Sequence, residues 1–108
     1  LSQVLALDWN TNGSYLASAS ADNVVRLWAL EPSGSLSDTM SLRGHTDNVE
    51  TLCWHPTNKD MLVTASSDKS VRIWDARTPS KPVHNVAMPG RVLSVSWSHD
   101  GKNIAAMN

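Results

Sequence analysis

Serine, histidine and aspartate residues occur in the chain at spacings that could build a hydrolase triad. Ser66 and Asp68 follow His45, and the same Ser-x-Asp spacing recurs at Ser20 and Asp22. In a triad the histidine takes a proton from the serine hydroxyl, while the aspartate orients the imidazole. The serine of many such enzymes sits in a Gly-x-Ser-x-Gly turn, and neither serine here has that context. We therefore expect these residues to stabilise the fold and the protein not to be an enzyme.

The other reactive residues do not point to metal or phosphate chemistry. The histidines and the single cysteine show none of the paired spacings that zinc sites use. These residues are His45, His55, His84, His99 and Cys53. The five glycines form no phosphate-binding loop. The sequence predicts no metal, no cofactor and no small-molecule substrate.

The composition sets limits on charge and compartment. The chain has 108 residues, of which 41% are hydrophobic, enough to bury a core. Its formal net charge is −1 and its nine Lys and Arg residues are scattered, which argues against a surface dedicated to nucleic-acid phosphates. The lone cysteine fits a reducing intracellular compartment, and no apolar run approaches the length of a membrane span. The chain begins at Leu1 without a signal-like segment, so we expect it to be part of a longer protein.

Residues 44–75 contain three predicted β-strands separated by two turns. Apolar and polar residues alternate along each strand, and β-branched residues are frequent. Turn-forming residues occupy 55–60 and 67–69. No window of the chain shows apolar residues at helical spacing over several turns. Applied to the whole chain, the same alternation and turn signals predict strands at 4–9, 15–20, 24–29, 38–43, 49–54, 61–66, 70–75, 83–88, 92–97 and 103–108.

The predicted strands repeat with a period of about 45 residues. Asp22 and Asp68 are 46 residues apart, as are Trp28 and Trp74. Three further tryptophans end the first strand of each unit, 45 and then 43 residues apart: Trp9, Trp54 and Trp97. Tryptophans can stack nucleic-acid bases, but recurrence at one place in every unit favours packing within or between sheets.

Four strands per unit, a Gly44-His45 start and a Trp74-Asp75 end resemble a WD repeat. The chain is identified as a member of the WD-repeat family, which implies an all-β fold of β-propeller blades with four antiparallel strands each. We expect part of one propeller domain, with two blades plus half of a third. The units are 1–43, which lacks its Gly-His, 44–88, which is complete, and 89–108, the start of the third.

The resemblance implies a structural role for the triad-like residues. In WD repeats a histidine lies between a carboxylate and a hydroxyl, and a tryptophan N–H ends the buried hydrogen-bond chain. The implied members are His45, Ser66, Asp68 and Trp74 in the second repeat, with Ser20, Asp22 and Trp28 in the first. The third repeat has Ala87-Met88 where Gly-His would stand, so we expect packing alone to hold it.

The segment from Leu62 to Arg77 is similar to a sixteen-residue box of WD-repeat receptors that dock on the adaptor of cullin-RING ubiquitin ligases. Asp68, Trp74, Asp75 and Arg77 occupy its positions 7, 13, 14 and 16. An ordinary surface pair of Asp75 and Arg77 would fill the same positions while contributing little to stability. A ubiquitin-ligase substrate receptor is therefore the alternative function.

Other motifs resemble one branch of the family, the third subunits of THO complexes. They are Gly44-His45-x-Asp47-x-Val49, Leu52-Cys53-Trp54-His55-Pro56, Val63-Thr64-Ala65-Ser66-x-Asp68-Lys69, Arg72-Ile73-Trp74-Asp75-x-Arg77-Thr78 and Trp97-Ser98-x-Asp100-Gly101. The resemblance implies a nuclear, non-catalytic scaffold that binds other protein subunits and helps couple transcription to mRNA export. It implies contact with RNA only through those partners, and no membrane.

Partner contacts are expected on loops, because a propeller holds its loops on rigid sheets. By position in the repeats, the expected contacts are Thr46, Asp47, Asn48, Lys69, Asp75, Arg77, Met88 and Arg91.

Overall fold

Ten β-strands make up the described part of the chain, residues 3–107 of a computed structural model. The first sheet contains β1 (Val4–Trp9), β2 (Tyr15–Ser20), β3 (Val25–Leu30) and β4 (Leu36–Leu42). The second contains β5 (Val49–Trp54), β6 (Met61–Ser66), β7 (Ser70–Asp75) and β8 (His84–Ala87). The third contains only β9 (Ser94–Trp97) and β10 (Ile104–Met107). Every paired strand is antiparallel, and no helix occurs between residues 3 and 107, so the predicted all-β fold class is confirmed.

The predicted strands differ from the observed ones only at their ends. The strand predicted at 92–97 begins at Ser94, and the strand predicted at 38–43 already begins at Leu36. Strand ends depend on the neighbouring strand as much as on their own residues, so local patterns define them poorly. Residue 108, the end of the strand predicted at 103–108, lies outside the described residues.

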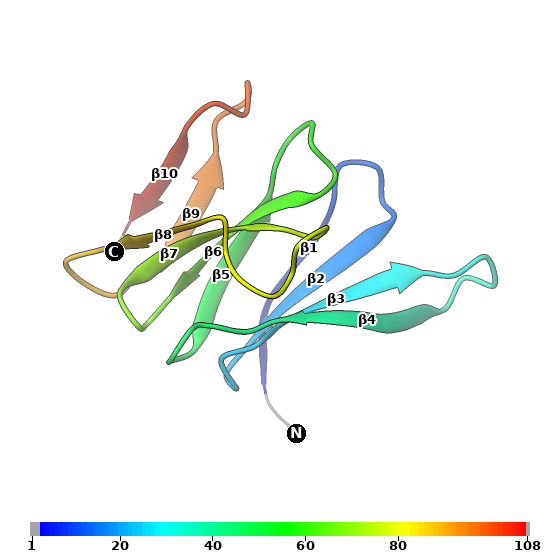
Figure 1. The fold of residues 1–108 in the computed structure, drawn as a ribbon, viewed down its shortest axis with the longest axis horizontal. Helices are drawn as coiled ribbons and strands as arrows, with labels where there is room; N and C mark the ends of the chain where they lie inside the picture. The colour runs from blue at the N-terminus through cyan, green and yellow to red at the C-terminus, as the bar shows by residue number, and fades with distance from the viewer. Residues whose placement is uncertain (1–2, 108) are drawn as a thin grey trace.

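The three sheets lie side by side in chain order, with the second sheet in the middle (Figure 1). This position explains why five successive residues of β6, from Leu62 to Ser66, are all buried. Alternate side chains of a strand point to opposite faces. Leu62 accordingly packs toward the first sheet, and Val63 packs toward the third.

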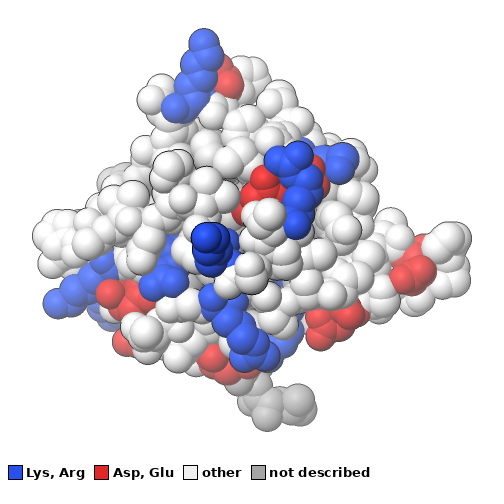
Figure 2. Space-filling view, viewed as in Figure 1, with Lys and Arg blue, Asp and Glu red and all other residues white. Residues whose placement is uncertain are grey.

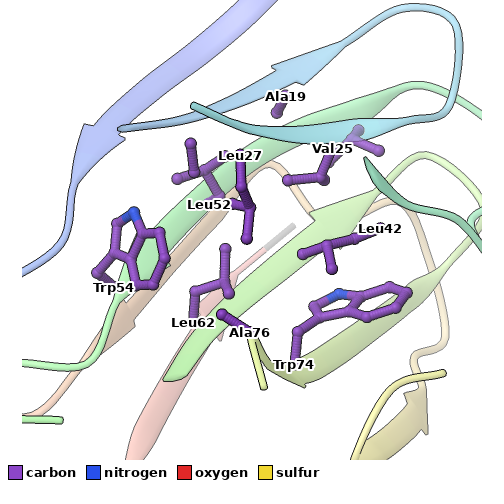
Figure 3. Packing of buried hydrophobic residues seen from close by; sticks show 11 residues of the cluster. Ala19, Val25, Leu27, Leu42, Leu52, Trp54, Leu62, Trp74 and Ala76 are labelled. Atoms are coloured by element: carbon purple, nitrogen blue, oxygen red, sulfur yellow. The ribbon is translucent and has the colours of Figure 1, made fainter. Parts of the chain in front are cut away.

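Two apolar clusters, one on each face of the second sheet, hold the sheets together. The larger contains Leu27 and Leu42 of the first sheet, together with Leu62 and Trp74 of the second (Figure 3). The smaller cluster joins the second sheet to the third through Val63, Val92 and their neighbours. Burying each large aliphatic side chain contributes about 1.5–3 kcal/mol, so these clusters are the main source of stability between sheets.

Tryptophans at the ends of β5 and β9 also join neighbouring sheets. The indole N–H of Trp54 donates to the backbone oxygen of Asp8 at 2.9 Å, and that of Trp97 donates to Cys53 at 3.1 Å. The repeated tryptophans at 54 and 97 therefore pack between sheets. Trp9, at the same place in the first sheet, is 46% exposed.

His55 makes a second contact between the second and third sheets. Its Nε2–H donates to the backbone oxygen of Gly101 at 3.0 Å, and its ring packs edge-on against Trp97. Nδ1 accepts the backbone N–H groups of Thr57 and Asn58, which holds the ring in one orientation. Gly101 has a φ of +75°, and a side chain there would collide with the imidazole.

Candidate functional site

A buried hydrogen-bond chain runs through the second sheet from a tryptophan to a carboxylate. The indole N–H of Trp74 donates to Thr64 Oγ1 at 2.9 Å, and Thr64 Oγ1 lies 2.7 Å from His45 Nε2. On its other side, His45 Nδ1 lies 2.8 Å from Asp68 Oδ2. The imidazole thus ties the loop before β5 to the turn between β6 and β7.

The hydroxyl in this chain belongs to Thr64, so the assignment of Ser66 to that position is wrong. Trp74 pairs with Leu62 across the strands, and the next residue on the same face of β6 is Thr64. Ser66 lies two residues further along, roughly 7 Å away at strand spacing, beyond the reach of the indole. Its hydroxyl instead donates to the backbone oxygens of Asp47 and Asn48.

The sequence carried a signal for the correct residue. A hydroxyl residue stands ten positions before the strand tryptophan in both repeats, as Thr64 before Trp74 and Ser18 before Trp28. Both pairs are hydrogen-bonded, at 2.9 and 3.0 Å. Ser20, assigned to the chain from the sequence, donates instead to Asp22 and to the backbone oxygen of Val24.

The protonation states of the buried pair follow from its surroundings. Burial lowers the pKa of His45, although the adjacent Asp68 opposes this shift. Burial alone would raise the pKa of Asp68, but hydrogen bonds from Ser70, His45 and the Thr46 N–H outweigh it and lower the pKa to about 2. A neutral imidazole then donates from Nδ1 to the carboxylate and accepts the Thr64 hydroxyl at Nε2. Every donor in the chain has an acceptor.

This geometry favours a structural role for the triad-like residues. Thr64 and Ser66 are fully buried, so neither hydroxyl is accessible to a substrate. His45 is also buried, and both of its ring nitrogens are already bonded. No group of three His, Cys, Asp or Glu side chains between residues 3 and 107 is arranged to hold a metal ion. The described chain also contains no helix long and apolar enough to cross a membrane.

The first sheet holds the equivalent residues in a different arrangement. Asp22 accepts a hydrogen bond from Arg26 Nη2 at 2.7 Å, and both side chains are partly exposed. Hydrogen bonds from Arg26 and Ser20 hold the pKa of Asp22 well below its usual range. Trp28 is bonded to Ser18, but no described residue connects that pair to Asp22.

Three loops meet at the edge of the second sheet next to His45. We call this surface the His45 rim, and it comprises residues 44–48, 67–69 and 88–91. The backbone N–H of Thr46 donates to Asp68 at 3.0 Å, and the N–H of Met88 donates to the backbone oxygen of Lys69 at 2.7 Å. The side chain of Arg91 donates to Ser67 and Glu50. These bonds give the rim a defined backbone shape.

The expected contact residues on this rim differ in exposure. Thr46, Asp47, Lys69 and Arg91 are exposed, and Asn48 is half-buried. The side chain of Met88 instead packs against the smaller apolar cluster, so it is poorly placed as a surface contact. Of the Ala87-Met88 pair that replaces Gly-His, Met88 therefore contributes packing to the interface with the third sheet, whereas Ala87 is exposed.

Lys69 has a left-handed backbone, with φ of +68°, and its counterpart in the first sheet is Asn23 at +73°. Asparagine tolerates this conformation, whereas a lysine there costs about 1 kcal/mol. Strained residues that persist at a surface often serve binding. The requirements of folding therefore do not explain why a lysine stands at position 69 of the rim.

Asp75 and Arg77 lie at the other end of the second sheet, on a surface that we call the Arg77 rim: residues 55–60, 75–83 and 98–103. Arg77 donates to both oxygens of Asp75, at 3.0 and 2.7 Å, and its Nε lies 3.7 Å from Asp60. Hydrogen bonding from Arg77 lowers the pKa of Asp75. β7 runs from Ser70, beside His45, to Asp75, so the His45 rim and the Asp75–Arg77 pair lie at opposite ends of this strand.

Charges are mixed on the molecular surface. Figure 2 shows basic and acidic side chains next to one another in small groups over the face in view. Three ion pairs of the structure place opposite charges together: Arg26–Asp22, Arg77–Asp75 and Arg91–Glu50. The described surface is therefore better suited to a protein partner than to a polyanion.

Comparison with known proteins identifies both a family and individual relatives. The chain matches the family model "WD domain, G-beta repeat" over residues 1–29 and 36–75. It is 43% identical to THO complex subunit 3 of Arabidopsis thaliana, over 98% of the chain and 34% of that protein. It is 32% identical to WD repeat-containing protein AAC3 of Dictyostelium discoideum, over 91% of the chain and 24% of that protein. It is also 34% identical to Coronin-7 of Mus musculus, over 96% of the chain and 12% of that protein. The chain thus spans about a third or less of the length of these relatives.

Proposed function

Because the chain belongs to the WD-repeat family, we propose that it is a non-catalytic scaffold and a subunit of a THO-type complex. WD-repeat proteins act generally as scaffolds for protein–protein interaction. The proposal that it is a THO-type subunit rests on the 43% identity to THO complex subunit 3 over 98% of the chain. In this role the protein is nuclear, supports mRNA export, and contacts RNA through its partner subunits.

We assign partner binding to the His45 rim. Its loops are held to one another by hydrogen bonds, so little conformational entropy is lost when a partner binds. Thr46, Asp47, Lys69 and Arg91 present both charge signs and hydrogen-bonding groups to solvent. The strained backbone of Lys69 supports this choice, because folding alone would favour another residue there.

The ubiquitin-ligase alternative has less support. Arg77 and Asp75 satisfy each other in a two-point hydrogen bond, which an exposed pair forms for local reasons. The relatives named above include no ubiquitin-ligase receptor by name. A docking role would be tested by Arg77→Ala, which would abolish co-purification with the ligase adaptor.

Affinity purification of the full-length protein, followed by mass spectrometry, tests the proposed function. We expect other THO-type subunits to be recovered in stoichiometric amounts. Recovery of coat, cytoskeletal or ubiquitin-ligase proteins in their place would contradict the proposal.

A matched pair of variants tests the assignment of the rim. Thr46→Arg adds a bulky charge to the His45 rim without removing a side-chain hydrogen bond, and should reduce recovery of the subunits at least tenfold. Thr57→Arg introduces the same side chain at an exposed position of the Arg77 rim, where it removes only a long 3.5 Å contact between Thr57 Oγ1 and His55 Nδ1, and should leave recovery unchanged. The opposite result would assign partner binding to the Arg77 rim.

A further inference from the structure

The loop that joins β7 to β8 contains an exposed threonine followed by proline, Thr78-Pro79. This is the only Ser-Pro or Thr-Pro dipeptide in the sequence, and a lysine follows at position 81. Thr78 and Lys81 are both exposed. Within residues 3–107, the hydroxyl of Thr78 makes no hydrogen bond and the ammonium of Lys81 makes no ion pair. The hydroxyl is therefore free to react.

The backbone of this loop is anchored only at its ends. The N–H of Ala76 donates to Asp60, that of Thr78 donates to Asp75, and that of Val83 donates to Ile73. Between these anchors, residues 79–80 form a turn, and no backbone hydrogen bond ties residues 79–82 to another strand or loop of the described chain. Figure 1 shows the segment as an open arc between the two strands. Few hydrogen bonds would have to break for an enzyme to bind it in an extended form.

The two prolines of the loop favour that extended form. Each proline restricts its own φ and disfavours helical geometry in the residue before it, which applies to Thr78 and Lys81. A proline directly after the acceptor also offers no N–H to the enzyme. The matching enzyme therefore has an apolar pocket at that position and an acidic or anionic group for the basic residue three positions after the acceptor.

From these observations we infer that Thr78 is a phosphorylation site for a proline-directed serine/threonine kinase. In the reaction Thr78 Oγ1 attacks the γ-phosphorus of Mg-ATP, and its proton passes to the catalytic aspartate of the kinase. A new oxygen–phosphorus bond forms as the bond to the bridging oxygen of ADP breaks, and ADP leaves with that electron pair.

The neighbourhood of Thr78 indicates what the phosphate would do. It carries a charge of about −1.5 to −2 and three strong acceptor oxygens at neutral pH. The preceding residue is Arg77, whose side chain is 69% exposed and bonded to Asp75. The phosphate competes with Asp75 for Arg77 and gains Lys81 as a second cation. Phosphorylation therefore opens the Asp75–Arg77 pair and changes the charge of the Arg77 rim, while the His45 rim is left intact.

The test is phosphorylation of the full-length protein by a cyclin-dependent-class kinase with Mg-ATP, with the site located by peptide mass spectrometry. We expect one phosphate at Thr78 in the wild type and none there in Thr78→Ala. Pro79→Ala should lower the initial rate at least tenfold. Ser80→Ala, a matched change in the same loop that keeps the Thr-Pro dipeptide, should leave the rate within twofold. Thermal unfolding of each variant checks that the fold is unchanged.

A synthetic peptide of residues 73–84 distinguishes recognition of the Thr-Pro sequence by the kinase from accessibility of the loop in the folded protein. Modification of both the peptide and the folded protein at Thr78 would support the proposal. Modification of the peptide with none in the folded protein would overturn it, because the loop would then not be accessible. A phosphate located at another residue, or none in either substrate, would overturn it too. None of these outcomes depends on which subunits the protein binds.

Discussion

The first and second sheets share a carboxylate, a hydroxyl and a tryptophan at equivalent positions, but they connect them differently. In the second sheet, His45 links Asp68 to Thr64 and Trp74 in one buried chain. In the first, Trp28 bonds Ser18, while a separate pair joins Asp22 to Arg26. The imidazole is the one component that converts two separate contacts into a connected network.

The arginines at equivalent positions show how the carboxylate selects its partner. Arg26 and Arg72 are 46 residues apart, the spacing of the repeat. Arg26 is bonded to Asp22. In the second sheet the Asp68 carboxylate is bonded to His45, and Arg72 packs beside Gly44, where an added side chain would have to displace its guanidinium. The Nε of Arg72 is left buried and without a hydrogen-bond partner within residues 3–107.

This difference has energetic consequences. A partly exposed pair such as Asp22–Arg26 contributes about 0–1 kcal/mol, because water screens it. Removing one member of a buried network leaves its partners unsatisfied, at about 1–3 kcal/mol for each neutral group and more for a charge. The second sheet should therefore be far more sensitive to substitution than the first.

The largest effect is expected for His45→Ala. It removes one hydrogen-bond donor to the Asp68 carboxylate and the acceptor of the Thr64 hydroxyl together, and should lower the free energy of unfolding by about 3–5 kcal/mol. Urea unfolding monitored by tryptophan fluorescence measures the change. Arg26→Ala is the matched substitution in the first sheet and should cost less than 1 kcal/mol. Equal losses in the two variants would contradict the contrast between the sheets.

Thr64→Val should have the next largest effect, at about 2 kcal/mol. The substitution keeps the shape of the side chain but leaves the Trp74 indole N–H and His45 Nε2 without their hydroxyl partner. Ser18→Ala removes the equivalent hydroxyl of the first sheet, which serves one bond, and should cost about 1 kcal/mol. If the two losses were equal, Thr64 would not be connected to His45 in solution.

Acid should destabilise the second sheet in two stages. The pKa of His45 is lower in the folded chain than its ordinary 6.5, so the unfolded chain binds more protons as the pH falls through that value, and stability decreases. The pKa of Asp68 falls from 3.8 to about 2 on folding, so its contribution, on the order of 2 kcal/mol, is present above pH 3.8 and lost toward pH 2.

Unfolding free energies between pH 8 and pH 2 measure both stages. In His45→Gln the stage near pH 6.5 should disappear. Its persistence in that variant would assign the upper stage to another histidine.

The smallest effect is expected at the left-handed turns. Lys69→Asn should stabilise the protein by up to about 1 kcal/mol, because asparagine accepts a positive φ more readily. Asn23→Lys, the reciprocal change in the first sheet, should destabilise by a similar amount. Comparing the thermal unfolding midpoint of each variant with that of the wild type would measure both changes. A destabilised Lys69→Asn would show that the lysine side chain itself supports the fold.

Much of the fold could be predicted because its signals are local. Alternation with a period of two defines a strand from a few adjacent residues, as along β6. Turn residues such as Asn23 and Lys69 mark the hairpins, and a repeat of 46 residues between Asp22 and Asp68 links one sheet to the next. These features can be recognised from the order of residues without any tertiary contact, so the sequence alone determined them.

The identity of the bonded partners was decided only by the tertiary structure. Thr64 and Ser66 are both hydroxyl residues on one face of β6, and only the register with Trp74 places Thr64 within reach of the indole. Met88 faces inward because the third sheet packs beside it. Whether a hydrogen bond forms depends on a few tenths of an ångström between donor and acceptor. Between segments that are remote in sequence, this distance is set only when the sheets pack together.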